Sequence, residues 1–174
     1  MTKVLFLDID GVCNSEEFMR AEHERTGRMV ILGIDPKPAA LVRQILADTG
    51  AKLVISSTWR HSEHDLQVIR DQVHPDIYGI TPRCASRFRG DEVRAWLEEH
   101  PEVGPYAILD DDGDFHRGQH LFQTSFKIGL TQEIADQVVK SLLLQTMAVD
   151  SYPKVVAGDG EPWQGLRTKA TDNS

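Results

Sequence analysis

The stretch VLFLDIDGV, at residues 4–12, decides the fold class of this 174-residue chain. Its β-branched and apolar beginning, ended by a glycine, predicts a buried strand of a parallel sheet. Asp8 and Asp10 fall where that strand ends and the backbone turns. Carboxylates this close repel each other, so both stay ionised at neutral pH only when a cation or hydrogen-bond donors lie between them. A hard cation that takes oxygen ligands, such as Mg2+, fits this place, although an ordinary acidic turn would also explain the segment alone.

Two further apolar runs also end in polar residues. Residues 107–109 lead into the acidic run DDDGD at 110–114, and residues 52–55 lead into SSTWR at 56–60. In an open α/β sheet the carboxyl ends of parallel strands share one edge, and ligands bind in the crevice outside it. We therefore expect the ends of these three strands to converge on one site.

The predicted elements alternate between strands and helices, which favours parallel strands joined by right-handed crossovers. Asp35 and Pro36 mark the start of one helix, and Gly50 marks its end. The expected fold class is α/β, with a three-layer, Rossmann-like parallel sheet. Strands are predicted at residues 3–8, 52–56, 78–80, 106–109 and 122–127. Helices are predicted within 14–34, from 36 to 50, and at 62–73, 91–99 and 131–147, the last capped by Thr131.

Length and composition predict one domain with a real core. The 40% apolar and 26% charged content is ordinary for a soluble globular protein, and we expect the domain at residues 1–149. Residues 150–174 are rich in Gly, Pro, Asp and Lys without periodicity, so we expect a flexible or loosely docked tail. No run approaches the roughly 20 apolar residues of a membrane span, and Met1 leads almost directly into a strand. A cytoplasmic protein without a membrane partner is therefore expected.

The cysteines and the charge exclude some classes of function. Cys13 and Cys84 make neither a disulfide framework nor a zinc site, and Cys13 is expected to be a passive buried thiol. The net charge of -8 argues against strong non-specific binding to a polyanion. Arginines nevertheless cluster near the predicted helix 91–99, as either a local basic rim or a solvated face balanced by acidic residues. These arginines are Arg60, Arg83, Arg87, Arg89 and Arg94, and the acidic residues are Asp91, Glu92, Glu98 and Glu99.

The chain resembles the haloacid-dehalogenase-like (HAD) phosphohydrolases in four motifs, which occur in the family's order over most of residues 3–145. Residues 8–12, DIDGV, resemble motif I, and Ser56 or Ser57 is similar to the motif II hydroxyl. Arg89 resembles the motif III base, and residues 110–111 resemble the acidic motif IV. The resemblance implies a HAD-like sheet, and the short segments between the motifs leave no room for a large cap domain.

Within that superfamily, three segments look most like the small HAD domains associated with nucleic-acid repair proteins. They are similar, more distantly, to the phosphatase half of polynucleotide kinase-phosphatases. The segments are STWR at 57–60, RGDEVRAWL at 89–97 and ILDDD at 108–112. A minimal cap implies an open site, suited to macromolecular substrates or completed by a partner.

The resemblance also implies roles for the motif I aspartates. Asp8 would attack phosphorus and form an aspartyl-phosphate, with Mg2+ between its carboxylate and the substrate. Asp10 would protonate the leaving oxygen and then activate water, and its backbone carbonyl would bind the metal. Because a halide needs no proton whereas an alkoxide does, Asp10 favours a phosphatase over a dehalogenase.

The remaining motifs would supply donors and metal ligands. Ser56 or Ser57 would donate to a phosphoryl oxygen, and Arg89, where the family more often has Lys, would pair with the nucleophile and the phosphoryl group. Asp110 and Asp111 would complete the metal site, directly or through water.

Other polar and aromatic residues near the strand ends have less defined roles. Asp112 and Asp114 are expected in outer positions, and Trp59 and Trp96 are expected to pack, with base stacking as the alternative. Surface or substrate-rim positions are expected for His61, His64, His116 and His120.

The sequence thus leads to three functional hypotheses. The favoured one is a Mg2+-dependent phosphomonoesterase that forms an aspartyl-phosphate, with nucleic-acid or nucleotide phosphate ends as one substrate class. The second is a phosphatase of small metabolites. The third is a non-catalytic HAD-like binding module, which is disfavoured because every catalytic position is filled. The sequence leaves the oligomeric state undefined.

Overall fold

The computed structural model describes residues 1–28, 33–86 and 88–151, and it confirms the predicted α/β class. One parallel sheet has the strand order β3-β2-β1-β4-β5. Its strands are β1 (Thr2–Leu7), β2 (Lys52–Ile55), β3 (Ile77–Ile80), β4 (Val103–Asp110) and β5 (Leu121–Gln123). The helices are α1 (Glu16–Thr26), α2 (Pro36–Thr49), α3 (Glu63–Gln72), α4 (Arg89–Glu99) and α5 (Gln132–Ser151), with a short 3-10 helix at Thr58–His61.

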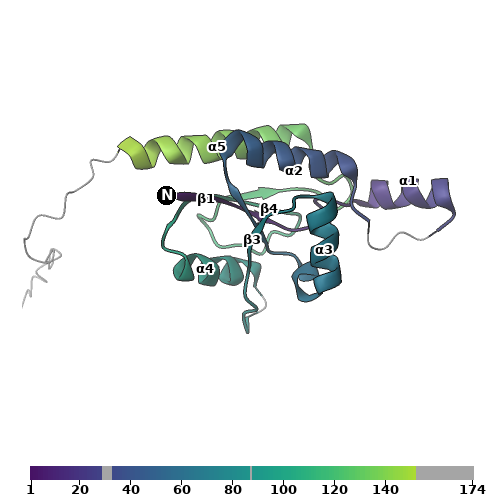
Figure 1. Cartoon of the computed structure of the whole chain (residues 1–174), viewed down its shortest axis with the longest axis horizontal. Helices are drawn as coiled ribbons and strands as arrows, with labels where there is room; N and C mark the ends of the chain where they lie inside the picture. Colours follow the sequence, from purple (N-terminus) through teal and green to yellow (C-terminus); the bar gives the residue numbers. More distant parts are fainter. Residues whose placement is uncertain (29–32, 87, 152–174) are drawn as a thin grey trace, which may run out of the picture.

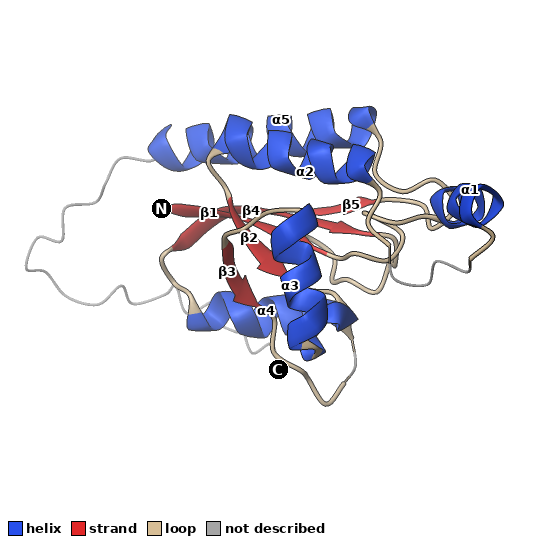
Figure 2. Ribbon diagram, turned by 45° about the vertical axis from the view of Figure 1, so that its right-hand side comes forward, coloured by secondary structure: helices blue, strands red, loops and turns tan. Residues whose placement is uncertain are grey.

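Helices cover both faces of the sheet, as a parallel sheet requires. Figures 1 and 2 show α2 and α5 together over one face and α4 on the opposite side. Successive residues of β1 point to opposite faces, so Leu5 and Leu7 pack in the cluster that includes α2 and α5. Val4 and Phe6 pack instead with α4, where Trp96 meets the Phe6 ring edge to face. This alternation determines which face each side chain at the strand ends will occupy.

Four predicted boundaries were wrong by two residues or more. β4 begins at Val103 instead of residue 106, because Val103 pairs with Thr2 at the start of β1. β5 ends at Gln123 instead of residue 127, because the chain turns where the Gly129 N–H donates to the Ser125 carbonyl at 2.7 Å. α4 begins at Arg89 instead of residue 91, since the Phe88 carbonyl already accepts from Asp91 N–H at 3.0 Å. α5 continues to Ser151, past the predicted end at 147, and the rest of the expected tail lies outside the described residues.

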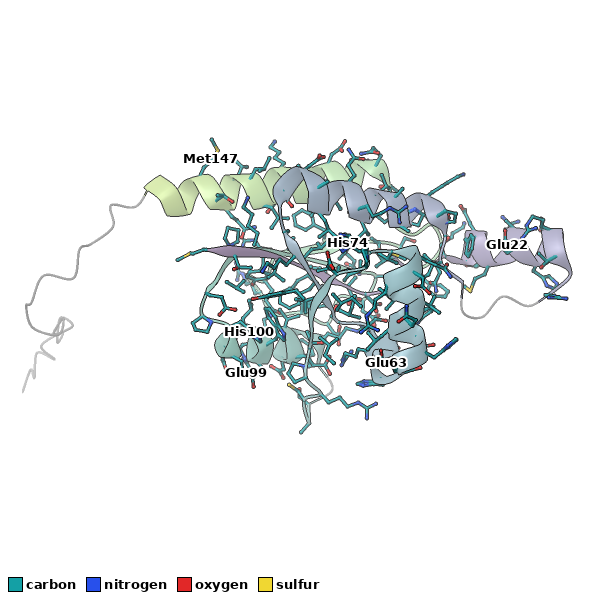
Figure 3. All side chains as sticks on the ribbon, viewed as in Figure 1. Glu22, Glu63, His74, Glu99, His100 and Met147 are labelled. Atoms are coloured by element: carbon teal, nitrogen blue, oxygen red, sulfur yellow. The ribbon has the colours of Figure 1, made fainter. Side chains whose placement is uncertain are left out.

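A single helix, α1, is the only regular element that the described residues place between β1 and α2. Ser15 caps it by accepting a hydrogen bond from Phe18 N–H, and none of its residues is buried. It projects from the body of the molecule, and Figure 3 shows Glu22 on it, away from the side chains packed around the sheet. The described part of the chain thus has one exposed helix between β1 and α2, consistent with a minimal cap.

Among the helices of the described residues, none combines the length and apolar character needed to cross a membrane.

Candidate active site

The three strand ends that the sequence singles out lie side by side. Leu7 of β1 is in register with Ile55 of β2 and with Leu109 of β4, so Asp8, Ser56 and Asp110 follow at one level. Backbone hydrogen bonds carry the pairing past the strands: Asp8 N–H donates to the Leu109 carbonyl at 2.9 Å, and Ser56 N–H donates to the Leu7 carbonyl at 3.0 Å. The candidate site therefore forms at the carboxyl edge of the sheet.

Three carboxylates gather there. Asp8, Asp110 and Asp111 each offer an oxygen, and these oxygens lie within 4.8 Å of one another. Asp8 and Asp110 are buried, at 1% and 0% exposure. Both Asp8 oxygens are buried without a hydrogen-bond donor among the described residues. A group of close carboxylate oxygens, of which the two of Asp8 accept no hydrogen bond from the described residues, suits a hard divalent cation such as Mg2+.

The electrostatics of the acidic group agree with that interpretation. Burial raises the pKa of Asp8, while the positive charge of Arg89 opposes the rise. Burial and the Asp8 charge raise the pKa of Asp110 to about 8. Burial and the neighbouring carboxylates also raise the pKa of Asp111. Such crowding keeps protons on the group unless positive charge is supplied.

Gly11 lets the motif I turn approach this group. Its φ of 72° lies in the left-handed region, and a Cβ at this position would lie 2.4 Å from Cγ of Asp111. A larger residue would therefore be strained and would also displace a carboxylate of the acidic group.

Arg89, in the first turn of α4, supplies the fixed positive charge. Its Nη1 lies 3.3 Å from Oδ1 of Asp8 and 3.0 Å from Oδ2 of Asp110. The same nitrogen donates to the Ser56 carbonyl at 3.3 Å. The guanidinium therefore connects all three strand ends.

Asp10 stands apart from the acidic group. Its carboxylate accepts a hydrogen bond from Nδ2 of Asn14 at 2.8 Å and another from Nε1 of Trp59 at 3.1 Å. Neither donor was predicted from the sequence. The signal available for Trp59 was chemical, because an indole N–H that becomes buried needs an acceptor. Asn14 also holds the motif I turn, since its Oδ1 accepts from Gly11 N–H at 3.1 Å.

The two candidate serines of motif II differ in their partners. Both are buried, at 2% and 0% exposure for Ser56 and Ser57. The Ser56 hydroxyl has no partner among the described residues. The Ser57 hydroxyl accepts a hydrogen bond from Trp59 N–H at 3.4 Å, capping the short helix.

Arg60 is buried, so neither of its two expected placements, a basic rim or a solvated charged face, was right. Its Nη1 donates to the carbonyls of Ser56 and Ser57, both at 2.7 Å, and its Nη2 pairs with Glu92 at 2.7 Å. These hydrogen bonds from Arg60 fix the chain after β2, which contains both serines. The charge of Arg60 is balanced by Glu92 of α4, and both side chains are buried.

Other expected rim residues are paired on the surface or lie away from the acidic group. Arg94 pairs with Asp91 at 2.7 Å, and His116 Nε2 lies 2.7 Å from the same carboxylate. His61 accepts from Arg83, whereas the structure shows no contact to the acidic group for His64 or His120. Arg87 lies outside the described residues.

The remaining candidates occupy outer or core positions. Asp112 is exposed, 3.8 Å from Nε of Arg89, and Asp114 accepts from Arg89 N–H at 3.2 Å. Trp96 packs against Phe6, at 3% exposure, and is therefore a core residue. Cys13 is fully buried, and burial raises the pKa of its thiol.

The parallel sheet of order β3-β2-β1-β4-β5, with a buried acidic group at the ends of β1 and β4, defines a HAD-like α/β protein. The chain belongs to a narrower family, because residues 4–135, about three quarters of its length, match the model for the HAD domain in Swiss Army Knife RNA repair proteins. This match confirms the resemblance to HAD domains of nucleic-acid repair proteins. Neither a curated protein nor a solved structure matches the chain significantly.

Proposed function

We propose that this protein is a Mg2+-dependent phosphomonoester hydrolase that acts through an aspartyl-phosphate on Asp8, with nucleic-acid phosphate ends as its substrates. The observation that carries the proposal is the buried Asp8 carboxylate, which lacks hydrogen-bond donors yet lies 3.3 Å from Nη1 of Arg89. A buried carboxylate without hydrogen bonds keeps its lone pairs free for attack on an electrophilic phosphorus, and a nearby cation would balance its charge.

Asp8, Asp110 and Asp111 would hold Mg2+ through their carboxylates, and Asp10 would contribute its backbone carbonyl. The bound ion would neutralise charge on Asp8 and on the phosphoryl oxygens.

The residues of the chain perform two transfers. A carboxylate oxygen of Asp8 bonds to phosphorus as the bond to the leaving oxygen breaks, and Asp10 gives its proton to that oxygen. Asp10 then takes a proton from water, whose oxygen attacks phosphorus and releases phosphate and free Asp8. The hydrogen bonds from Asn14 and Trp59 orient the Asp10 carboxylate for both steps.

Donors surround the phosphoryl group in this scheme. Arg89 is placed to bind a phosphoryl oxygen while it contacts Asp8, and a planar guanidinium can do so with two N–H groups. The unpartnered Ser56 hydroxyl is the first candidate for the motif II donor, and Ser57, whose oxygen already accepts from Trp59 N–H, is the second. Single Ser56→Ala and Ser57→Ala variants distinguish them, because loss of the hydroxyl that donates in the transition state should lower kcat more than it raises KM.

The family match and the open site support a nucleic-acid end as the substrate. The match is to a domain of RNA repair proteins, and α1 is the one regular element at the cap position among the described residues. A small metabolite needs enclosure, which an exposed helix without buried residues does not supply.

The test is Mg2+-dependent hydrolysis of an aryl phosphate and of oligonucleotides phosphorylated at the 3' or 5' end. We expect wild-type turnover, a preference for one oligonucleotide end, and no turnover by Asp8→Asn. Asp48→Asn, which makes the same change at an exposed position of α2, is the matched control and should keep wild-type activity. No turnover of any substrate by a folded, Mg2+-loaded wild type would contradict the proposal.

A further inference from the structure

A pocket of about 470 Å3 opens beside the acidic group. The 3-10 helix after β2, the loop after β3 and the start of α4 line it. Three arginines take part, and Arg89 is shared with the acidic site, where it contacts Asp8. The principal lining residues are Arg60, His61, Arg83, Cys84, Arg89 and Glu92.

The pairings within this pocket leave one positive charge unbalanced. Arg89 faces Asp8 and Asp110, and Arg60 is balanced by Glu92 at 2.7 Å. Within the described ranges, no carboxylate pairs with Arg83, which remains exposed. Its Nε donates to Nε2 of His61 at 3.0 Å, an arrangement that needs a neutral imidazole. The pocket is therefore cationic at neutral pH through Arg83.

The exposed Arg83 makes the pocket suited to an anion. Arg83 is held by His61 instead of by an acidic partner, so its remaining N–H groups are available to a ligand. Arg60 also lines the pocket, but its Nε is fully buried and its Nη2 pairs with Glu92, so the accessible arginine donors of the pocket belong to Arg83 and Arg89.

We propose that this pocket binds a second phosphate of the substrate, the phosphodiester that neighbours the phosphate hydrolysed at Asp8. This inference rests on the proposed function, since it adds a subsite to the same reaction. Arg89 connects the two places, because it contacts Asp8 and also lines the pocket. A phosphodiester carries one negative charge and matches the single unbalanced charge of Arg83. A second phosphomonoester would carry nearly two negative charges.

The first test compares two substrates in each protein. One is a dinucleotide phosphorylated at the end that the wild type prefers, and the other has a neutral methylphosphonate in place of its internal phosphodiester. We expect the wild type to favour the charged substrate about tenfold in kcat/KM, and Arg83→Gln to reduce this ratio to about one. Arg94→Gln, outside the pocket on the same helix as Arg89, should keep the wild-type ratio.

Because each ratio is measured within one protein, a general loss of folding or activity cancels. A wild-type ratio near one, or a ratio unchanged in Arg83→Gln, would overturn the subsite while leaving the phosphatase intact. A wild type that hydrolyses no phosphomonoester at all would overturn the proposed function itself. A clear preference for a nucleoside bisphosphate over the dinucleotide would assign the pocket to a second phosphomonoester and overturn the phosphodiester assignment.

The second test needs no catalysis. Cys84 lines the pocket and is half-buried, whereas Cys13, the other cysteine of the chain, is fully buried. In the Asp8→Asn protein we expect the phosphorylated dinucleotide to slow modification of Cys84 by a thiol reagent, and the methylphosphonate analogue to slow it at least about threefold less. Equal protection by both, or none by either, would contradict the subsite.

Discussion

Asp8 and Asp10 are separated by one residue, yet their surroundings are opposite. Asp8 is buried at 1% exposure, with both oxygens lacking a donor, beside two further carboxylates. Asp10 is only partly buried, and its carboxylate accepts hydrogen bonds from Asn14 and Trp59. The Asp8 carboxylate thus accepts no hydrogen bonds from the described residues, whereas the Asp10 carboxylate is oriented by two.

The difference follows from where each residue lies. Asp8 continues β1 in register with β4, so the sheet brings it to Asp110 on the α4 face. Asp10 opens the turn that runs through Gly11, after β1 has ended at Leu7, and its carboxylate accepts from the indole of Trp59 in the short helix. Under the proposed function, the nucleophile would occupy the first environment and the proton carrier the second.

The largest expected effect comes from removing the unsatisfied carboxylate. Asp8→Asn should lower kcat/KM by at least about 10,000-fold, because the amide oxygen is a poor nucleophile for phosphorus. It should also abolish any covalent phosphoprotein, which intact-protein mass spectrometry after acid quenching detects in the wild type. The metal-free variant should be no less stable than the wild type, since a neutral amide replaces a crowded buried carboxylate. Residual activity above one percent would contradict the assignment of the nucleophile.

Removing the oriented carboxylate should cost less and should depend on the leaving group. Asp10→Asn is expected to lower kcat by about 100- to 1,000-fold for an alkyl phosphate, because the leaving alkoxide must be protonated. An aryl phosphate with an acidic leaving group needs no proton, so the variant should carry out the first step faster with it than with an alkyl phosphate. Phosphorylated Asp8 should then accumulate, because the amide of the variant cannot activate the water that hydrolyses it. Steady-state kinetics across leaving groups and the mass of the quenched protein measure both effects. Equal losses for every leaving group, with no phosphoprotein, would place Asp10 outside proton transfer.

Metal binding should depend on pH through the acidic group, where Asp110 has a pKa raised to about 8. Carboxylates with raised pKa values favour the metal-free fold below their unfolded pKa, and this contribution is lost as pH rises toward the folded value. Mg2+ binds the deprotonated group, so it should stabilise the protein more at pH 8.5 than at pH 6. At a concentration about 100 times its dissociation constant, the gain in unfolding free energy is about 2.7 kcal/mol.

Thermal unfolding with and without Mg2+ at several pH values tests this dependence. Asp110→Asn should weaken the stabilisation by Mg2+ and flatten its change with pH, whereas the exposed Asp48→Asn should preserve both. A Mg2+ effect that is the same at pH 6 and pH 8.5 in the wild type would show that these carboxylates do not hold the ion.

The sequence could predict the strand-derived half of this comparison but not the other half. Asp8 and Asp110 follow apolar runs, so the rule that parallel strands share a carboxyl edge was enough to bring them together. The indole N–H of Trp59 donates to Asp10, 49 residues away in the sequence, and the Arg60 guanidinium donates to Glu92, 32 residues away. Such contacts depend on side-chain geometry that periodicity does not encode. Boundaries such as the start of α4 at Arg89 depend likewise on single hydrogen bonds.

The smallest predicted effect isolates the orientation of Asp10. Trp59→Phe keeps most of the buried ring but removes the N–H that donates to Asp10 at 3.1 Å, so kcat for an alkyl phosphate should fall about tenfold. In the Asp10→Asn background the same change should add little, because the two residues act as a unit. Trp96→Phe, equally buried but without a contact to Asp10, is the control and should retain kcat. A tenfold loss both in the wild-type background and in Asp10→Asn would mean that Trp59 acts through packing. A loss confined to the wild-type background would mean that its indole N–H positions the proton carrier.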